Sequence, residues 1–238
     1  MLRFAPCELV AIAAHPDDAE LGCGGTLASF ALAGSATILD LTRGERASRG
    51  TPEARWGEAK QAAQALGVGR VCLELPDSEL RGTDPEQRAA LVEALRQLRP
   101  RWVLLPHPRD PHPDHRHAFE LARAAIFLGR VAGYGSGQPW HPELVLAYPG
   151  PRQLFEPQLV VDVSPAYERK RKALACYRSQ FAPGEGVATH LASGFFLQAV
   201  EGRDRAFGNT VGVAFGEGFV LVEPTNAKAL AEFLERLP

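Results

Sequence analysis

The first residues that could do chemistry form the run His15-Pro16-Asp17-Asp18, which directly follows the apolar stretch Cys7–Ala14. Zn²⁺ binds histidine nitrogen and carboxylate oxygen in a roughly tetrahedral shell, and catalytic zinc sites keep one position open. His15 and Asp18 are close enough in a turn to bind one ion, and Asp17 would then remain free beside it. The alternative is that Asp17 or Asp18 simply caps a following helix.

A second run of the same kind begins at His112 and ends at His115, just after the apolar stretch Trp102–Leu105. Two histidines with an Asp between them, opposite another His-Asp cluster, are rarely structural residues only. His117 falls two residues past His115, so on a helix it faces elsewhere. We expect neither His117 nor the neighbouring His107 to belong to the site.

Apolar runs alternate with helix-like segments through the first two-thirds of the chain. Strands are expected at Cys7–Ala14, Ala36–Leu41, Val71–Leu75, Trp102–Leu105, Leu144–Tyr148, Leu159–Val163 and Phe219–Val222. Helices are expected at Thr26–Ala33, Glu53–Leu66, Pro85–Leu98 (capped by Asp84), His115–Leu128, Pro165–Tyr177, Ser193–Phe207 and Ala227–Leu237. This alternation predicts an α/β fold with a mainly parallel sheet and helices on both faces. Such sheets bind ligands at the carboxyl ends of their strands, where both His-Asp runs fall.

The glycines of Gly22-Cys23-Gly24-Gly25 lie between the first strand and its helix. They do not form the Gly-x-Gly-x-x-Gly loop of dinucleotide-binding proteins. We interpret them as residues that permit a tight turn and close packing of the helix on the sheet. We find no linker that would separate a second domain, so residues 1–238 are expected to form one domain.

Composition excludes several other classes of protein. Of the 238 residues, 45% are hydrophobic and 23% charged, as in an ordinary globular protein, and the net charge of −2 does not favour nucleic-acid binding. The apolar stretches are too short to span a membrane. We expect no signal peptide, because an apolar strand is expected within a few residues of the N-terminus, and the four scattered cysteines lack the spacing of a disulfide framework. We therefore expect a cytoplasmic protein.

Several segments of the chain together match the pattern of a known family. They are AHPDDAELGCGGTLA at 14–28, LTRGE at 41–45, PD at 76–77, HPDH at 112–115, YRSQF at 177–181 and EGF at 217–219. These segments resemble the LmbE family of zinc-dependent de-N-acetylases of N-acetylglucosamine (GlcNAc) compounds, which includes the phosphatidylinositol-N-acetylglucosamine (PIG-L) deacetylases. The order of the segments and the tail are most similar to the branch that deacetylates N-acetylglucosaminyl malate in bacillithiol synthesis. The family fold is a Rossmann-like α/β sandwich.

The resemblance implies that zinc is bound by His15, Asp18 and His115, with Asp17 as the general base. Zinc lowers the pKa of bound water and polarises the amide carbonyl, and a nearby carboxylate can take the proton of the water. Histidine and carboxylate ligands also suit Fe²⁺ or Co²⁺.

The resemblance further implies that His112 supports the tetrahedral intermediate or protonates the leaving amine, and that Asp114 orients His112. Glu45, Arg55 and Asp77 match polar positions that contact substrate in relatives. Arg55 and Arg109 are the basic residues that we expect to bind a malate carboxylate. The substrate-binding candidates are therefore Glu45, Arg55, Asp77 and Arg109.

Two positions depart from the family pattern. Relatives carry a tyrosine where this chain has Phe195, so Tyr148 or Tyr177 would have to supply that hydroxyl. Relatives can carry arginine directly before the second run, where this chain has Pro111, and Arg109 lies two residues earlier.

The sequence therefore predicts a zinc-dependent enzyme that removes the N-acetyl group from a small GlcNAc conjugate, with N-acetylglucosaminyl malate favoured. Deacetylation of GlcNAc-inositol or of chitobiose-type sugars is the alternative within this class. A non-catalytic sugar- or nucleotide-binding module and a structural zinc protein are alternatives of other classes. A homo-oligomeric state is left open.

Overall fold

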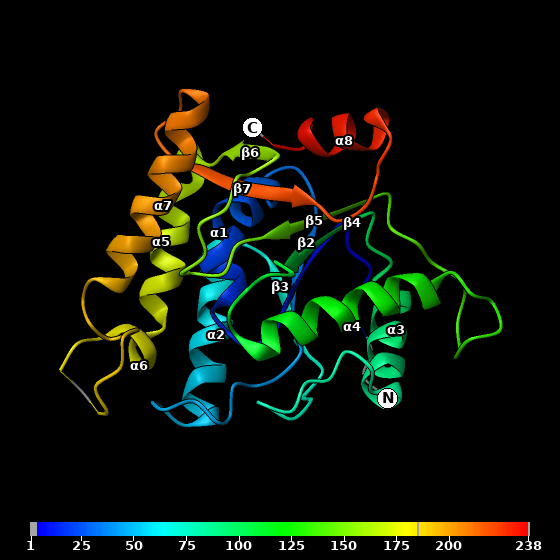
Figure 1. Ribbon diagram of the computed structural model, residues 1–238, viewed down its shortest axis with the longest axis horizontal. Coiled ribbons are helices and arrows are strands. Elements are labelled where there is room, and N and C mark those ends of the chain that lie inside the picture. Colours follow the sequence, from blue (N-terminus) through cyan, green and yellow to red (C-terminus); the bar gives the residue numbers. More distant parts are fainter. Residues whose placement is uncertain (1–3, 185, 238) are drawn as a thin grey trace.

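The fold is built on a seven-stranded sheet with the strand order β3-β2-β1-β4-β5-β7-β6 (Figure 1). The computed structural model describes residues 4–184 and 186–237. The strands are β1 (Leu9–Ala13), β2 (Ala36–Asp40), β3 (Gly69–Cys72), β4 (Trp102–Pro106), β5 (Leu144–Tyr148), β6 (Leu159–Asp162) and β7 (Gly216–Leu221).

Eight α-helices and a 3₁₀ turn at Ser164–Ala166 connect these strands in the described part of the chain. The helices are α1 (Asp18–Phe30), α2 (Pro52–Leu66), α3 (Pro85–Leu98), α4 (Pro113–Gly129), α5 (Tyr167–Cys176), α6 (Arg178–Phe181), α7 (Phe196–Val211) and α8 (Ala227–Leu234).

The first five strands pair in parallel, whereas β7 runs antiparallel to both β5 and β6. The expected α/β fold with a mainly parallel sheet is therefore confirmed. The strand order reverses direction between β1 and β4, because the chain first builds outward through β2 and β3 and then returns to the other side of β1.

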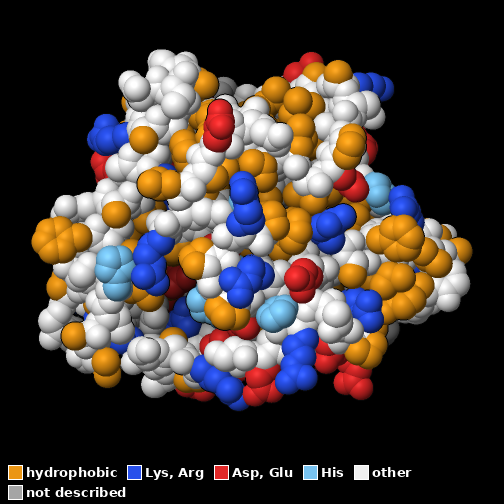
Figure 2. All heavy atoms as spheres, viewed as in Figure 1, with side chains coloured by type: hydrophobic (Ala, Val, Ile, Leu, Met, Phe, Trp, Pro, Cys, Tyr) orange, Lys and Arg blue, Asp and Glu red, His pale blue; other side chains and the backbone are white. Residues whose placement is uncertain are grey.

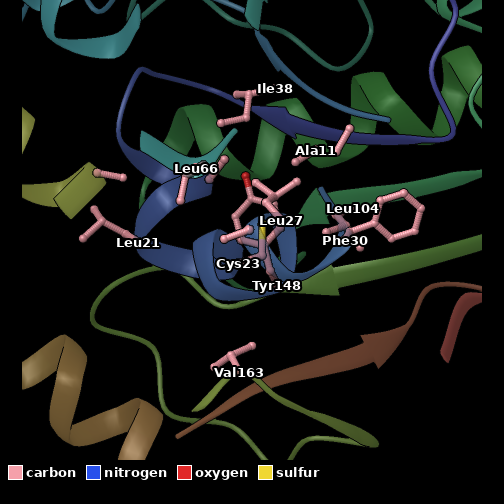
Figure 3. Close-up of a cluster of buried hydrophobic side chains, with 14 of the residues drawn as sticks. Ala11, Leu21, Cys23, Leu27, Phe30, Ile38, Leu66, Leu104, Tyr148 and Val163 are labelled. Atoms are coloured by element: carbon pink, nitrogen blue, oxygen red, sulfur yellow. The ribbon is translucent and has the colours of Figure 1, made fainter. Parts of the chain in front are cut away.

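Alternating residues of β1 face two separate hydrophobic cores. Leu9 and Ala11 pack with residues of α1, α2, α5 and α7, whereas Val10 and Ile12 pack with residues of α3 and α4. Figure 3 shows the first core, where Leu27 of α1 lies among side chains from neighbouring strands and loops. Helices therefore cover both faces of the sheet, which is why the strands read as continuous apolar runs.

Helix α1 begins at Asp18, eight residues before the expected start at Thr26. Its backbone breaks at Cys23, where φ is −145° and ψ is 22°. A Cβ atom at Gly22 would lie 2.2 Å from the ring of Tyr148, and one at Gly25 would lie 2.6 Å from Val163. The glycines therefore permit close packing, as expected, but they do so inside a helix and not in a loop.

Other boundaries differ from the sequence expectation at the ends of elements. The expected helix at Ser193–Phe207 runs from Phe196 to Val211, and the expected strand at Phe219–Val222 begins earlier, at Gly216. Asp84 caps α3 as expected, because its carboxylate accepts hydrogen bonds from the backbone N–H groups of Glu86 and Gln87. Within the described residues, no helix has the length and apolar composition needed to cross a membrane.

Candidate active site

The two His-Asp runs meet at the carboxyl edge of the sheet. The run at His15 follows β1, the run at His112 follows β4, and these two strands are adjacent where the strand order reverses. Open α/β sheets bind ligands at this switch point, because the loops that leave the two strands diverge and open a crevice.

His15, Asp18 and His115, the three expected metal ligands, lie together in this crevice. Nδ1 of His15 is 3.3 Å from Oδ2 of Asp18, and Nε2 of His115 is 3.2 Å from Oδ1 of the same carboxylate. His112 adds a third imidazole, with a nitrogen within 4.8 Å of nitrogens of His15 and His115. Imidazole nitrogen and carboxylate oxygen are zinc donors, so the donor set fits a candidate metal site.

The electrostatics of this cluster also favour a cation. Burial lowers the pKa of His115, but the Asp18 charge and a hydrogen bond with Asp110 outweigh it and raise the pKa to about 10. The pKa of His15 is likewise raised, against burial, by hydrogen bonds with Asp114, Asp18 and Asp77. Burial raises the pKa of Asp18, yet the neighbouring imidazoles bring it well below its usual value. The carboxylates of the cluster thus stabilise positive charge beside them, and a bound cation would supply that charge.

The outer nitrogen of His15 is held by two carboxylates. Its Nε2 lies 3.2 Å from Oδ2 of Asp114 and 3.2 Å from Oδ1 of Asp77. The side chain of Asp114 therefore faces His15. Its backbone N–H, and not its carboxylate, donates to Nδ1 of His112. The role expected for Asp114, orienting His112, stays a prediction.

Ser78 fixes one of these carboxylates. Its backbone has a positive φ of 63°, and its N–H donates to Oδ2 of Asp114 over 2.8 Å. Asp77, the preceding residue, was expected to bind substrate but accepts a hydrogen bond from the backbone N–H of Arg46 and lies against His15. A carboxylate that holds the second nitrogen of a metal-binding histidine fixes the tautomer and orientation of the ring.

Asp110 is a site residue that the sequence reasoning missed. Its Oδ2 lies 3.1 Å from Nδ1 of His115, and its Oδ1 accepts a hydrogen bond from the backbone N–H of His112. A Cβ atom at Gly150 would lie 1.7 Å from Oδ2, so this approach requires glycine there. The available signal was an acidic residue two positions before a candidate ligand run.

Asp17 occupies the N-cap position of α1. Its side chain accepts no capping hydrogen bond from the helix residues that the structure describes. Its φ of 101° is unusual for a residue with a side chain, and such strain is often found at functional sites. Burial raises the pKa of Asp17 to about 7, although the Arg55 guanidinium opposes this shift. The carboxylate is therefore poised near neutral pH, as a general base needs to be.

His112 is the N-cap of α4 and is exposed. Its Nδ1 accepts a hydrogen bond from the backbone N–H of Asp114 over 3.2 Å. Nδ1 is therefore unprotonated, and the neutral ring carries its proton on Nε2. Burial of part of the ring lowers the pKa of His112, and the charges of His115 and His15 lower it further. His112 thus presents a neutral N–H donor.

A pocket of about 690 Å³ opens above the cluster. On the face shown in Figure 2, some histidine and acidic side chains are recessed behind their neighbours, and Lys and Arg side chains lie around them. Pockets of this volume suit a small molecule such as a mono- or disaccharide conjugate. Residues from several segments that are distant in sequence line its walls, among them Arg46, Arg49, Pro111, Arg152, Gln180, His190, Leu191 and Phe196.

The expected substrate contacts are placed unevenly around this pocket. Arg55 lines it, but its guanidinium is buried and donates to the backbone oxygens of Gly44 and Pro16 and to Asp17. Glu45 accepts a hydrogen bond from the backbone N–H of Asp77 and lies outside the described lining. Arg109 is exposed and also lies outside that lining.

Neither tyrosine replaces the hydroxyl missing at Phe195. Tyr148 is buried and donates its hydroxyl to the backbone oxygen of Ile12, and Tyr177 donates to Glu20. Phe195 is itself 72% exposed. The late segment instead contributes Thr189 and His190 to the pocket lining, and the His190 ring packs edge-on against Phe196.

The fold and the His-Asp cluster at its switch point define a metal-dependent hydrolase. Residues 10–126 match the PIG-L family, described as GlcNAc-PI de-N-acetylase. The diacetylchitobiose deacetylase of Thermococcus kodakarensis is 31% identical over 189 residues, which cover 73% of this chain and 70% of that protein. The chain belongs to the PIG-L family and is a metal-dependent N-deacetylase.

Two solved structures share the whole fold. The conserved protein TT1542 from Thermus thermophilus has a TM-score of 0.84 and 41% identity, covering 92% of this chain and 96% of that one. The N,N'-diacetylchitobiose deacetylase from Pyrococcus horikoshii has a TM-score of 0.78 and 24% identity, covering 94% and 88%.

The named activities of the relatives do not single out the expected branch of the family. Besides the chitobiose enzymes, a 1D-myo-inositol 2-acetamido-2-deoxy-alpha-D-glucopyranoside deacetylase of Kineococcus radiotolerans is 31% identical over 179 residues. These residues cover 57% of this chain and 50% of that protein. The similarity thus supports the family but not specifically the bacillithiol branch.

Proposed function

We propose that this protein hydrolyses the N-acetyl group of a small GlcNAc-containing molecule with zinc as its metal, releasing acetate and the free amine. The observation that carries the proposal is that His15 and His115 both contact the carboxylate of Asp18. Asp17 lies beside them, and its side chain makes no capping hydrogen bond to α1. Zinc is supported by the tetrahedral preference of such mixed nitrogen and oxygen donors.

His15, Asp18 and His115 would hold the ion, and zinc bound there supplies Lewis-acid chemistry that polarises the acetamide carbonyl and acidifies water. Asp17 accepts the proton of the attacking water as oxygen adds to the carbonyl carbon. Asp77 and Asp114 keep the proton of His15 on Nε2, so that Nδ1 stays free for the metal. The C–N bond then breaks, and Asp17 can return its proton to the leaving amine.

His112 stabilises the developing oxyanion. Because its Nδ1 caps α4, its Nε2–H is the donor left to face the pocket. A donor fixed in this way costs no reorganisation when charge develops on the acetamide oxygen. Helix capping and oxyanion binding thus use opposite nitrogens of the same ring.

Chitobiose-type and inositol-linked GlcNAc are the favoured substrates. The named activities of the relatives support them. Arg55, which was expected to bind a malate carboxylate, instead donates its hydrogen bonds to backbone oxygens and to Asp17. The pocket has room for a second ring beyond the sugar that carries the acetamide.

The test is acetate release from diacetylchitobiose, GlcNAc-inositol, GlcNAc-malate and free GlcNAc, using protein stripped of metal and reloaded with zinc. We expect zinc-dependent turnover of at least one of the first two substrates, faster than of the malate conjugate. Preferred turnover of GlcNAc-malate would refute the substrate choice. Binding of these sugars without acetate release from any of them would favour a non-catalytic binding module.

A further inference from the structure

The break in α1 is capped on both sides by buried charged side chains. On the first side, Nη2 of Arg203 donates to the backbone oxygen of Leu21 over 2.6 Å. On the second side, the Glu217 carboxylate accepts from the backbone N–H groups of Gly25 and Thr26 over 2.8 and 2.7 Å. A helix end buried without such partners would leave polar groups unsatisfied, so these two residues make the break possible.

These residues belong to a buried cluster of four charges. Lys170 bonds to Asp204 over 2.7 Å and to Glu217 over 2.6 Å, and Arg203 bonds to Asp204 over 2.8 Å. All four residues are at most 5% exposed. Two positive and two negative charges balance, which buried ions require if they are to remain charged. The cluster thus links α1, α5, α7 and β7 by hydrogen bonds.

Arg203 also reaches the loop after β5, in which Pro151 and Arg152 line the active-site pocket. Its Nη1 donates to the backbone oxygen of Gly150 over 3.2 Å. Gly150 packs directly against Asp110, whose carboxylate faces His115. The guanidinium of Arg203 therefore bonds both to the first turns of α1, which begin with Asp18, and to Gly150. Gly150 in turn packs against Asp110, the partner of His115.

We infer that Arg203 is a positioning residue that sets the separation of the Asp18 and His115 sides of the metal site. Only a planar fork can donate to Leu21, Gly150 and Asp204 at once, and lysine has one nitrogen for all three. The inference rests on the ligand set of the proposed function, although the residue lies outside the pocket lining.

The test compares Arg203→Lys with Arg96→Lys. Arg96 is a matched control because it is equally buried, at 5% exposure, and also donates to backbone oxygens, those of Gly129, Ser136 and Val131, at the far end of α4. The zinc Kd is measured by chelator competition at a temperature where both variants are folded. Loss of groups that orient ligands weakens metal binding by about 10- to 100-fold, so we expect Arg203→Lys to raise the Kd about tenfold and Arg96→Lys to leave it unchanged.

A second readout uses the metal-free protein. Amide hydrogen exchange should rise in Arg203→Lys both at residues 21–26 and around Gly150, whereas in Arg96→Lys it should rise only near Gly129. An unchanged zinc Kd in folded Arg203→Lys, or equal losses in both variants, would overturn the inference. Should the wild type bind no zinc, the proposed function fails, and unchanged exchange at the two segments would then refute the positioning role separately.

Discussion

The guanidinium of Arg55 lies 3.4 Å from the carboxylate of Asp17, although the two residues are 38 positions apart in the chain. Both side chains are buried, so this contact is little screened by water. It lowers the pKa of Asp17 against the larger effect of burial, which leaves the pKa at about 7. Arg55 therefore adjusts the pKa of Asp17, the proposed base. This role differs from the contact with substrate that was expected for Arg55.

Arg55→Met should move the acid limb of the kcat/KM profile to higher pH. Asp17 accepts a proton only when ionised, so activity falls as pH drops below its pKa. Removing the positive charge raises that pKa, and a bound cation lowers it in both proteins without reversing the difference. The measurement is a pH–rate profile of acetate release, with Arg55→Lys as the charge-preserving control. Superimposable profiles for wild type and Arg55→Met would contradict the tuning role.

Asp17→Asn should retain zinc and fold but lose about 10²–10⁴-fold in kcat. Asparagine tolerates the positive φ of 101° at this position, so the backbone is preserved, while the amide cannot accept the proton of the water. Turnover and zinc content are measured on the same samples. Near-normal kcat with zinc bound would mean that another group is the base. Loss of zinc would make Asp17 a ligand.

His112→Ala and His112→Asn should separate the two roles of this ring. Both variants lose the Nε2–H donor, and removal of one oxyanion donor typically costs about 10²–10³-fold in kcat. Asparagine is itself a good N-cap, so only the alanine variant also loses the cap of α4. We expect that loss to lower the free energy of unfolding by about 1 kcal/mol. The checks are kcat and urea unfolding. Equal stability of the two variants would show that the ring does not cap the helix.

The metal-free protein should lose stability as pH rises from about 6.5 toward 10. The pKa of His115 is raised to about 10 in the fold, whereas it is about 6.5 in an unfolded chain. The favourable contribution of the protonated ring is therefore complete below about pH 6.5 and disappears as the pH passes through 10. Urea unfolding after chelation, at about pH 6 and about pH 9, tests this linkage. His115→Gln should show a shallower dependence, and an equal slope in both proteins would contradict the assignment.

Local sequence signals were enough to predict most elements and the chemistry that follows them. Apolar runs such as Cys7–Ala14 and Trp102–Leu105 predict buried parallel strands, and these strands form β1 and β4. The runs at His15 and His112 come directly after them, so their meeting at one edge follows from the rule for parallel sheets. Periodicity, helix caps and motif spacing depend on neighbouring residues, which is why they can be read without the fold.

The pairing of carboxylates with histidines, in contrast, came from packing between distant elements. Asp114 adjoins His112 in sequence, yet its side chain contacts His15, 99 residues away, because the helical start of α4 turns the carboxylate toward β1. Asp110 contacts His115 and packs against Gly150, and the backbone oxygen of Gly150 accepts a hydrogen bond from Arg203, although Gly150 belongs to neither motif. Such contacts depend on strand order and on the break in α1, which no local pattern encodes, since they arise when separate elements pack together.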